Sequence, residues 1–151
     1  MPAETIHASC VILDEAGILI RGPSGAGKST LAREIVWAAT QAGRFACHVA
    51  DDRTRIEARS GRLLARPVSA VSGKLEVRGV GLTPVANEGA AIVRLLLDLS
   101  SEPPPRLPEE KELAATLCGI VVPRRTLRSG TPSTDLILAW ARETLHTPVT
   151  L

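Results

Sequence analysis

Aromatic residues are almost absent from this chain of 151 residues, which has one phenylalanine, two tryptophans and no tyrosine. A core without aromatics must be aliphatic, and the apolar fraction of 44% is enough to fill one. Charge of one sign is also lacking, because the net charge is only +2. A charge this small does not indicate a nucleic-acid-binding surface, so no nucleic-acid partner is predicted. The length predicts a single domain over residues 1–151.

Cysteine is limited to Cys10, Cys47 and Cys118, an odd number without a CxxC pair. This pattern predicts neither a disulfide framework nor a zinc site. No basic-then-apolar leader opens the sequence, and no apolar run reaches the roughly 18 residues of a membrane helix. We therefore expect a reduced, cytoplasmic protein that has no membrane partner.

What the chain does contain is the glycine-rich stretch GPSGAGKS at residues 22–29, which fits the pattern GxxxxGK[ST]. Residues without a Cβ let the backbone curl so that its N–H groups point at phosphate oxygens, and a helix start adds more donors. Lys28 would neutralise the β and γ phosphates, and the Ser29 hydroxyl is suited to Mg²⁺. The predicted nucleotide-binding residues are Gly22, Pro23, Ser24, Gly25, Ala26, Gly27, Lys28, Ser29 and Thr30.

Strand patterns outnumber helical patterns, and most of them are neighbours in the sequence. Apolar runs at 10–13 and 18–20, separated by turn residues 14–17, predict a hairpin that leads into the glycine-rich stretch. Residues 90–100 fit a buried strand or a buried helix equally well. The other predicted elements are a helix over 28–42 closed by Gly43, a strand over 44–50, a hairpin over 55–67 turning at Ser60–Gly61, a short strand that runs into a glycine-rich stretch within 73–82, a strand over 117–125 and a helix over 133–146. This order predicts an α/β P-loop domain with a mixed β-sheet.

Two acids, Asp51 and Asp52, follow the predicted strand at 44–50. A P-loop enzyme needs a carboxylate near the γ-phosphate to hold metal or to position the attacking group. Side chains alternate along a strand, so neighbouring acids reach one site only where the strand ends. One acid would then accept a proton or activate a hydroxyl, while the other would act on metal or on orientation. Asp51 is a candidate metal ligand.

A second charged pair, Glu76 and Arg78, shares one face of the short strand predicted within residues 73–82. The pair is either a surface ion pair, or a second Mg²⁺ ligand (Glu76) beside a contact for the transferred phosphate (Arg78). The spacing alone fits both interpretations.

Three stretches in this order, HASCVILDEAGILIRGPSGAGKST, VADDR and LEVRGVG, resemble the catalytic domain of HPr kinase/phosphorylase. The resemblance covers residues 5 to 82. It implies a P-loop α/β fold akin to phosphoenolpyruvate carboxykinase, commonly assembled as a hexamer. It also implies a bacterial enzyme that uses ATP and Mg²⁺ to phosphorylate a serine of HPr, a small phosphocarrier protein. Many members reverse the reaction by phosphorolysis.

The resemblance assigns roles to individual residues. It implies that Asp52 is the acid/base for the serine proton and that Lys28 is the phosphate lysine. Ser29 and Glu76 match the magnesium ligands, His7 matches a histidine at the edge of the active site, and Arg106 matches an arginine near the transferred phosphate.

The leading hypothesis is therefore an ATP- and Mg²⁺-dependent serine kinase acting on HPr or a related phosphocarrier, regulating carbon or nitrogen metabolism. A small-metabolite P-loop kinase and a non-catalytic nucleotide-sensing module are the alternatives. Small-metabolite kinases usually carry an arginine-rich lid between helices. Here the candidate arginines, Arg124, Arg125 and Arg128, follow a predicted strand instead.

Overall fold

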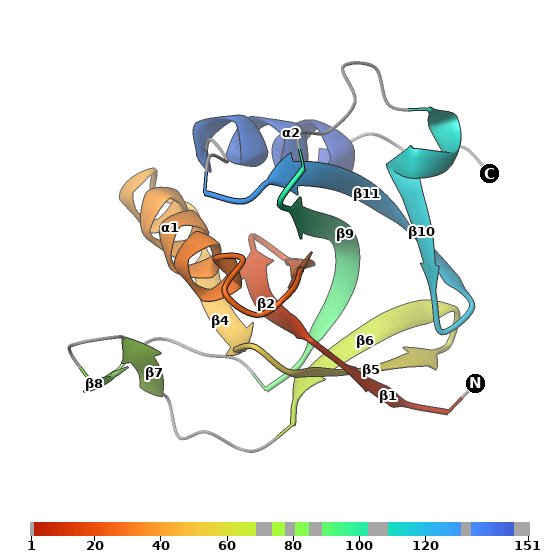
Figure 1. Cartoon of the computed structure of the whole chain (residues 1–151), viewed down its shortest axis with the longest axis horizontal. Coiled ribbons are helices and arrows are strands. Elements are labelled where there is room, and N and C mark those ends of the chain that lie inside the picture. The colour runs from red at the N-terminus through yellow and green to blue at the C-terminus, as the bar shows by residue number, and fades with distance from the viewer. Residues whose placement is uncertain are drawn as a thin grey trace.

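A computed structural model of the chain describes residues 2–68, 74–77, 81–84, 89–102, 109–130 and 134–146. Their secondary structure, in chain order, is β1 (Glu4–Ile6), β2 (Ala8–Leu13), β3 (Ala16–Arg21), α1 (Lys28–Gln41), β4 (Ala46–Ala50), β5 (Thr54–Arg59), β6 (Arg62–Pro67), β7 (Lys74–Val77), β8 (Gly81–Pro84), β9 (Ala91–Ser100), the 3₁₀ helix η1 (Glu110–Leu113), β10 (Ala114–Leu117), β11 (Ile120–Arg128) and α2 (Thr134–His146) (Figure 1).

The main sheet is mixed, which confirms the predicted α/β domain with a mixed β-sheet. Its strand order is β1-β5-β6-β9-β3-β2-β4. Strand β11 lies outside this order and pairs with β9 and β10. The ten-residue β9 pairs with β6 through its first residues and with β11 through its last ones. Strands β3, β9 and β11 are parallel, and β4 runs in the same direction because β2 is antiparallel to both β3 and β4. The carboxyl ends of β4, β3, β9 and β11 therefore meet at one edge.

The two faces of the central strands are both buried. Leu95, Leu97 and Leu99 of β9 pack on the face covered by α1 and α2, whereas Leu96 lies in a second cluster with residues of β5, β6 and β10. A strand buried on both faces reads as a continuous apolar run, which explains why the sequence of residues 90–100 could not distinguish strand from helix. The core is aliphatic, as predicted, and Trp37 and Phe45 lie on the surface.

The helices and the first two hairpins agree with the sequence expectations. In α1 the buried residues recur at helical spacing on one face, as in Leu31, Ile35 and Ala39. Gly43 follows the helix with a φ of 76°, a conformation that glycine adopts without strain. No helix in the described ranges is both long and apolar enough to cross a membrane.

Two segments form hairpins where single strands were predicted. The short strand predicted within residues 73–82 is β7, and it pairs antiparallel with β8, which begins at Gly81. Residues 117–125 span the end of β10, a turn at Cys118–Gly119 and part of β11. Both turn residues have positive φ angles, 50° and 79°, as a two-residue hairpin turn requires. Cysteine is an unusual residue for the first of these positions, so the turn could not be recognised from its composition.

Candidate active site

The candidate site is built around the loop of residues 22–27, which joins β3 to α1 at the shared edge of the sheet. Gly25 and Gly27 have φ angles of 81° and 95°, which side chains with a Cβ rarely adopt. At Gly22 a Cβ would lie 3.1 Å from the backbone oxygen of Leu99 on β9. The three glycines are therefore required by the curl of the loop and by its close approach to the neighbouring strand.

The start of α1 completes a cradle for an anion. The helix begins at Lys28, no side chain caps its amino terminus, and its first turn contains no acid. The first N–H groups of a helix have no intrahelical acceptor and carry partial positive charge. This donor set suits the phosphate groups of a nucleotide, as the sequence pattern predicts for residues 22–30.

Lys28 lies across the mouth of the loop. Its side chain is only 4% exposed, and its Nζ donates hydrogen bonds to the backbone oxygens of Gly22 at 2.9 Å and Pro23 at 3.1 Å. The same Nζ lies 3.6 Å from a carboxylate oxygen of Asp52, whose side chain is 60% exposed. A buried ammonium and an accessible carboxylate thus face each other beside the cradle.

Asp51 contacts the second residue of the helix, Ser29. Its Oδ1 accepts a hydrogen bond of 2.5 Å from the hydroxyl of Ser29. A hydroxyl and a carboxylate that converge in this way, next to a phosphate cradle, form a donor set that fits Mg²⁺. Among the described residues no three His, Cys, Asp or Glu side chains gather as a metal site, so phosphate oxygens and water would supply most of the coordination.

Both acids reach one site because the chain bends directly after β4. Asp52 has a φ of 63°, in the left-handed region, and the backbone N–H of Arg53 donates to the backbone oxygen of Asp51 at 2.7 Å. This turn removes the alternation of a regular strand, so both carboxylates face the start of α1.

The other predicted site residues are placed less completely. His7 is exposed and precedes Ala8, which pairs with Arg21 immediately before the loop, so His7 lies at the same edge of the sheet. Glu76 lies on β7, but its side chain is outside the described part of the chain. Arg78 and Arg106 both fall outside the described residues.

Ser9 is a site residue that the sequence did not indicate. It is fully buried on β2, donates a hydrogen bond to Asp51 Oδ1 at 3.2 Å and accepts one from the backbone N–H of Asp52 at 3.1 Å. One hydroxyl therefore holds both acids. Its contacts reach 42 and 43 residues along the chain, and a serine within an apolar strand carries no signal of such a role.

Asp98 near the end of β9 is a buried acid at this edge, whereas Asp51 and Asp52 are exposed. It accepts two hydrogen bonds from Arg21, at 2.7 and 2.8 Å, and one from Arg124 at 2.5 Å. Burial alone would raise the pKa of Asp98, but the hydrogen bonds from the two arginines outweigh it and hold that pKa below its ordinary value. Asp98 lies two residues after Leu96 and therefore points to the same face of β9, which is the face opposite α1. The cluster of Arg21, Asp98 and Arg124 thus joins β3, β9 and β11 and does not face Ser29.

Comparison with known proteins gives a consistent family. Residues 1–95 match the family described as HPr Serine kinase C-terminal domain. The HPr kinase/phosphorylase of Clostridium tetani is 38% identical over 84 residues, which is 56% of this chain and 26% of that protein. That of Streptococcus thermophilus is 38% identical over 92 residues, 60% of this chain and 28% of that protein. The matched part of the chain thus corresponds to between a quarter and a third of these curated relatives.

The fold agrees with a solved structure. The Hpr(Ser) kinase/phosphatase from Coxiella burnetii superimposes with a TM-score of 0.73 over 93% of this chain and 89% of that one, at 24% sequence identity. The resemblance predicted from the three sequence stretches is confirmed. The chain belongs to the HPr serine kinase C-terminal domain family.

Proposed function

We propose that this chain is the catalytic domain of an ATP- and Mg²⁺-dependent kinase that phosphorylates a serine of HPr or a related phosphocarrier protein. The observation that carries the proposal is the position of the Asp52 carboxylate, 3.6 Å from Lys28 Nζ and open to solvent at the mouth of the phosphate loop. The names of the curated relatives support the choice of acceptor.

The geometry supports direct transfer of the γ-phosphoryl group to a hydroxyl. Asp52 would accept the proton of the acceptor serine while the serine oxygen forms its bond to the γ-phosphorus. The bond from that phosphorus to the bridging oxygen breaks, and its electron pair leaves with ADP. A serine hydroxyl is a weak acid, so a carboxylate is sufficient if it receives the proton late. Lys28 would neutralise charge on the phosphates, and positioning supplies most of the remaining catalysis.

The metal fits the hydroxyl of Ser29 and the carboxylate of Asp51. Mg²⁺, when bound, neutralises phosphate charge and aligns the phosphoryl group. Ser29 and Asp51 would hold it, with Ser9 fixing the Asp51 side chain. Glu76 remains a predicted further ligand.

The alternatives differ from this proposal in features that can be checked. Arg124, Arg125 and Arg128 lie on β11, so the candidate lid arginines of a small-metabolite kinase are on a strand of the main sheet. A non-catalytic nucleotide sensor would bind nucleotide equally well with or without the Asp52 carboxylate and would turn none over.

The test is transfer of labelled phosphate from ATP to purified HPr in the presence of Mg²⁺. We expect Asp52→Asn to lower the transfer rate by about 10² to 10⁴, the usual contribution of a general base, while nucleotide binding is retained. Asp135→Asn, which changes an exposed aspartate in the first turn of α2, is the matched control and should transfer at the unaltered rate. No transfer from the unaltered protein to any phosphocarrier would overturn the proposal.

Resemblance to the family suggests a reverse reaction and an oligomeric assembly, and both are proposed with the kinase activity. Phosphorylated HPr and inorganic phosphate should yield pyrophosphate, with Asp52 returning its proton to the serine oxygen. A homo-oligomer, a hexamer by resemblance, should be visible by light scattering. Absence of pyrophosphate would remove the phosphorylase activity and leave the kinase proposal intact.

A further inference from the structure

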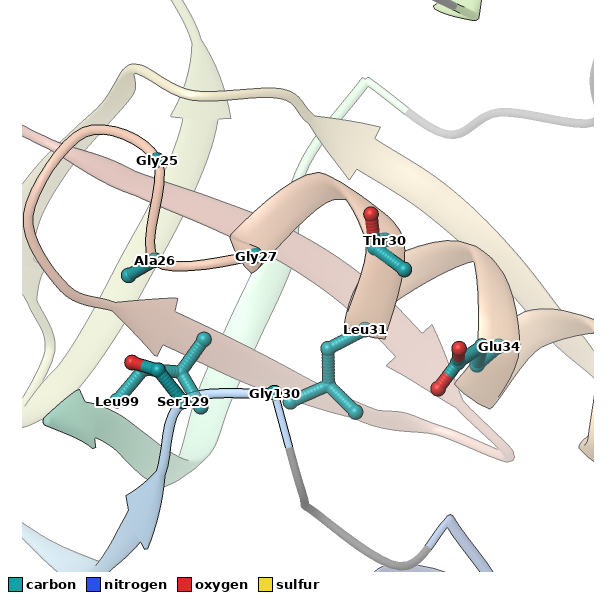
Figure 2. Close-up of a pocket in the computed structure, with 9 residues that line it drawn as sticks. All are labelled: Gly25, Ala26, Gly27, Thr30, Leu31, Glu34, Leu99, Ser129 and Gly130. Carbon is teal, nitrogen blue, oxygen red and sulfur yellow. The ribbon is translucent and has the colours of Figure 1, made fainter. Parts of the chain in front are cut away.

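A cavity of about 430 Å³ adjoins the phosphate loop, as Figure 2 shows. One wall is formed by loop residues 25–27, and Leu31 and Glu34 extend the lining along α1. The opposite wall is formed by Ser129 and Gly130, which directly follow β11. The volume is within the usual range of small-molecule sites.

The strand order places this cavity and the two acids on opposite sides of the loop. Asp51 and Asp52 follow β4, which is separated from β3 by β2 on one side. Leu99 and Ser129 line the cavity; Leu99 belongs to β9 and Ser129 directly follows β11, on the other side of β3. A triphosphate that lies in the loop with its last phosphorus toward Asp52 therefore has its other end directed at the cavity.

The chemistry of the lining suits a nucleoside better than more phosphate. Leu31 and Leu99 are 2% and 4% exposed and provide an apolar floor. Glu34 contributes a carboxylate, and the hydroxyl of Thr134 at the start of α2 donates to its Oε2 at 3.4 Å. A carboxylate repels phosphate, but it is a strong acceptor for sugar hydroxyls.

The wall opposite α1 is positioned by the sheet. The backbone N–H of Ser129 donates to the backbone oxygen of Ser100 at 2.8 Å, which holds the end of β11 beside the end of β9. A Cβ added to Gly130 would meet no atom of the described residues within 4 Å. The cavity thus has one wall fixed by strand pairing and another fixed by α1.

We propose that this cavity, here called the nucleoside pocket, binds the nucleoside half of the nucleotide. In this arrangement Glu34 accepts hydrogen bonds from the ribose hydroxyls and the base lies over Leu31 and Leu99. The inference rests on the proposed function only in taking the loop as the seat of the phosphates. It makes the site selective for a nucleoside triphosphate over an inorganic polyphosphate, and it makes Glu34 the residue that senses the sugar.

The experiment compares the binding of three ligands by isothermal titration calorimetry, with Mg²⁺ and without acceptor protein. They are ATP, 2′,3′-dideoxy-ATP, which lacks both ribose hydroxyls, and inorganic tripolyphosphate, which lacks the nucleoside. Glu34→Ala should weaken ATP binding about tenfold, the effect of losing a hydrogen bond to a charged group. It should leave the affinities for tripolyphosphate and dideoxy-ATP within about twofold of those of the unaltered protein.

Two further variants make the result interpretable. Ser129→Leu should fill the nucleoside pocket and weaken ATP without weakening tripolyphosphate. Glu15→Ala removes an exposed carboxylate from the turn between β2 and β3, at the opposite edge of the sheet, and should change neither. Circular dichroism spectra would identify a variant that fails to fold, in which case Glu34→Gln takes the place of Glu34→Ala.

The possible outcomes separate this inference from the proposed function. If Glu34→Ala weakens ATP and tripolyphosphate equally, or weakens neither, the nucleoside pocket is wrong while the phosphate loop stands. The pocket is equally wrong if the unaltered protein binds dideoxy-ATP as tightly as ATP. If the unaltered protein binds none of the three ligands, both the proposed function and the nucleoside pocket are overturned.

Discussion

Ser9→Ala tests whether one buried hydroxyl positions the two acids of the candidate site. In the structure this hydroxyl donates to Asp51 and accepts from the backbone N–H of Asp52, and it has no exposure to solvent. Alanine removes both hydrogen bonds and adds no bulk. The turn that holds Asp52 at a φ of 63° then loses its anchor to β2.

The expected magnitudes follow from these contacts. A hydrogen bond to a charged group contributes about 1.5–3 kcal/mol, and leaving a buried donor unsatisfied costs a similar amount. Asp51 keeps its bond to Ser29, so we expect a loss in the free energy of unfolding of about 2–3 kcal/mol. Displacing a catalytic group by about 1 Å can lower a rate by about 10²-fold, so kcat should fall by roughly 10- to 100-fold. The KM for ATP should stay within about twofold, because within the described part of the chain the Ser9 hydroxyl bonds to the two acids and not to the phosphate loop.

The assay combines phosphate transfer to HPr with urea unfolding of the same samples. Thr54→Val is the matched control, because the Thr54 hydroxyl is equally buried and donates to the backbone oxygen of Ala8 at 2.7 Å without contacting either acid. It should lose about 1–2 kcal/mol of stability and keep its kcat. The reasoning fails if Ser9→Ala keeps the full kcat, or if the kcat of Thr54→Val falls as far as that of Ser9→Ala.

Three further predictions concern the acids, the metal and a buried histidine. Asp98→Asn should lower the free energy of unfolding by about 2–3 kcal/mol, because two partly buried guanidinium groups lose their carboxylate. Asp14→Asn breaks the more exposed pair with Arg44 and should cost under about 1 kcal/mol. Equal losses for the two variants in urea unfolding would contradict this prediction. Ser29→Ala should raise the Mg²⁺ concentration for half-maximal transfer at least tenfold, roughly the loss of one ligand, and an unchanged Mg²⁺ titration would argue against the metal assignment. Burial lowers the pKa of His48, so the unfolded state binds the proton first and the stability of the protein should fall as the pH drops below about 6.5. His48→Gln should flatten that fall in thermal unfolding between pH 7 and pH 5. An equally steep fall in this variant would contradict the prediction.

Local patterns explain why much of the fold could be predicted. The helix at α1 follows from apolar residues at helical spacing between a glycine-rich start and Gly43, and the turn at Ser60–Gly61 follows from its composition. The turn at Cys118–Gly119 has the same pair of positive φ angles, but its first residue gives no turn signal. Sheet topology could not be read at all, because the pairing of β9 with β3, β6 and β11 depends on contacts between distant segments.

The candidate site divides in the same way. Lys28, Ser29, Asp51 and Asp52 are each part of a short pattern, and the structure brings all four together at one edge of the sheet. Ser9 acts only through partners more than forty residues away. Glu34 is one more polar residue on the exposed side of α1 until residues 129 and 130 form the facing wall. Long-range contacts of this kind leave no trace in a local pattern.

The most direct test of the account is a crystal structure of the protein with Mg²⁺ and a non-hydrolysable ATP analogue. We expect the phosphates inside the loop of residues 22–27, the metal on Ser29 and Asp51, and the Asp52 carboxylate beside the terminal phosphorus. A loop without phosphate, or an analogue whose terminal phosphorus lies on the side of β11 away from both acids, would contradict it.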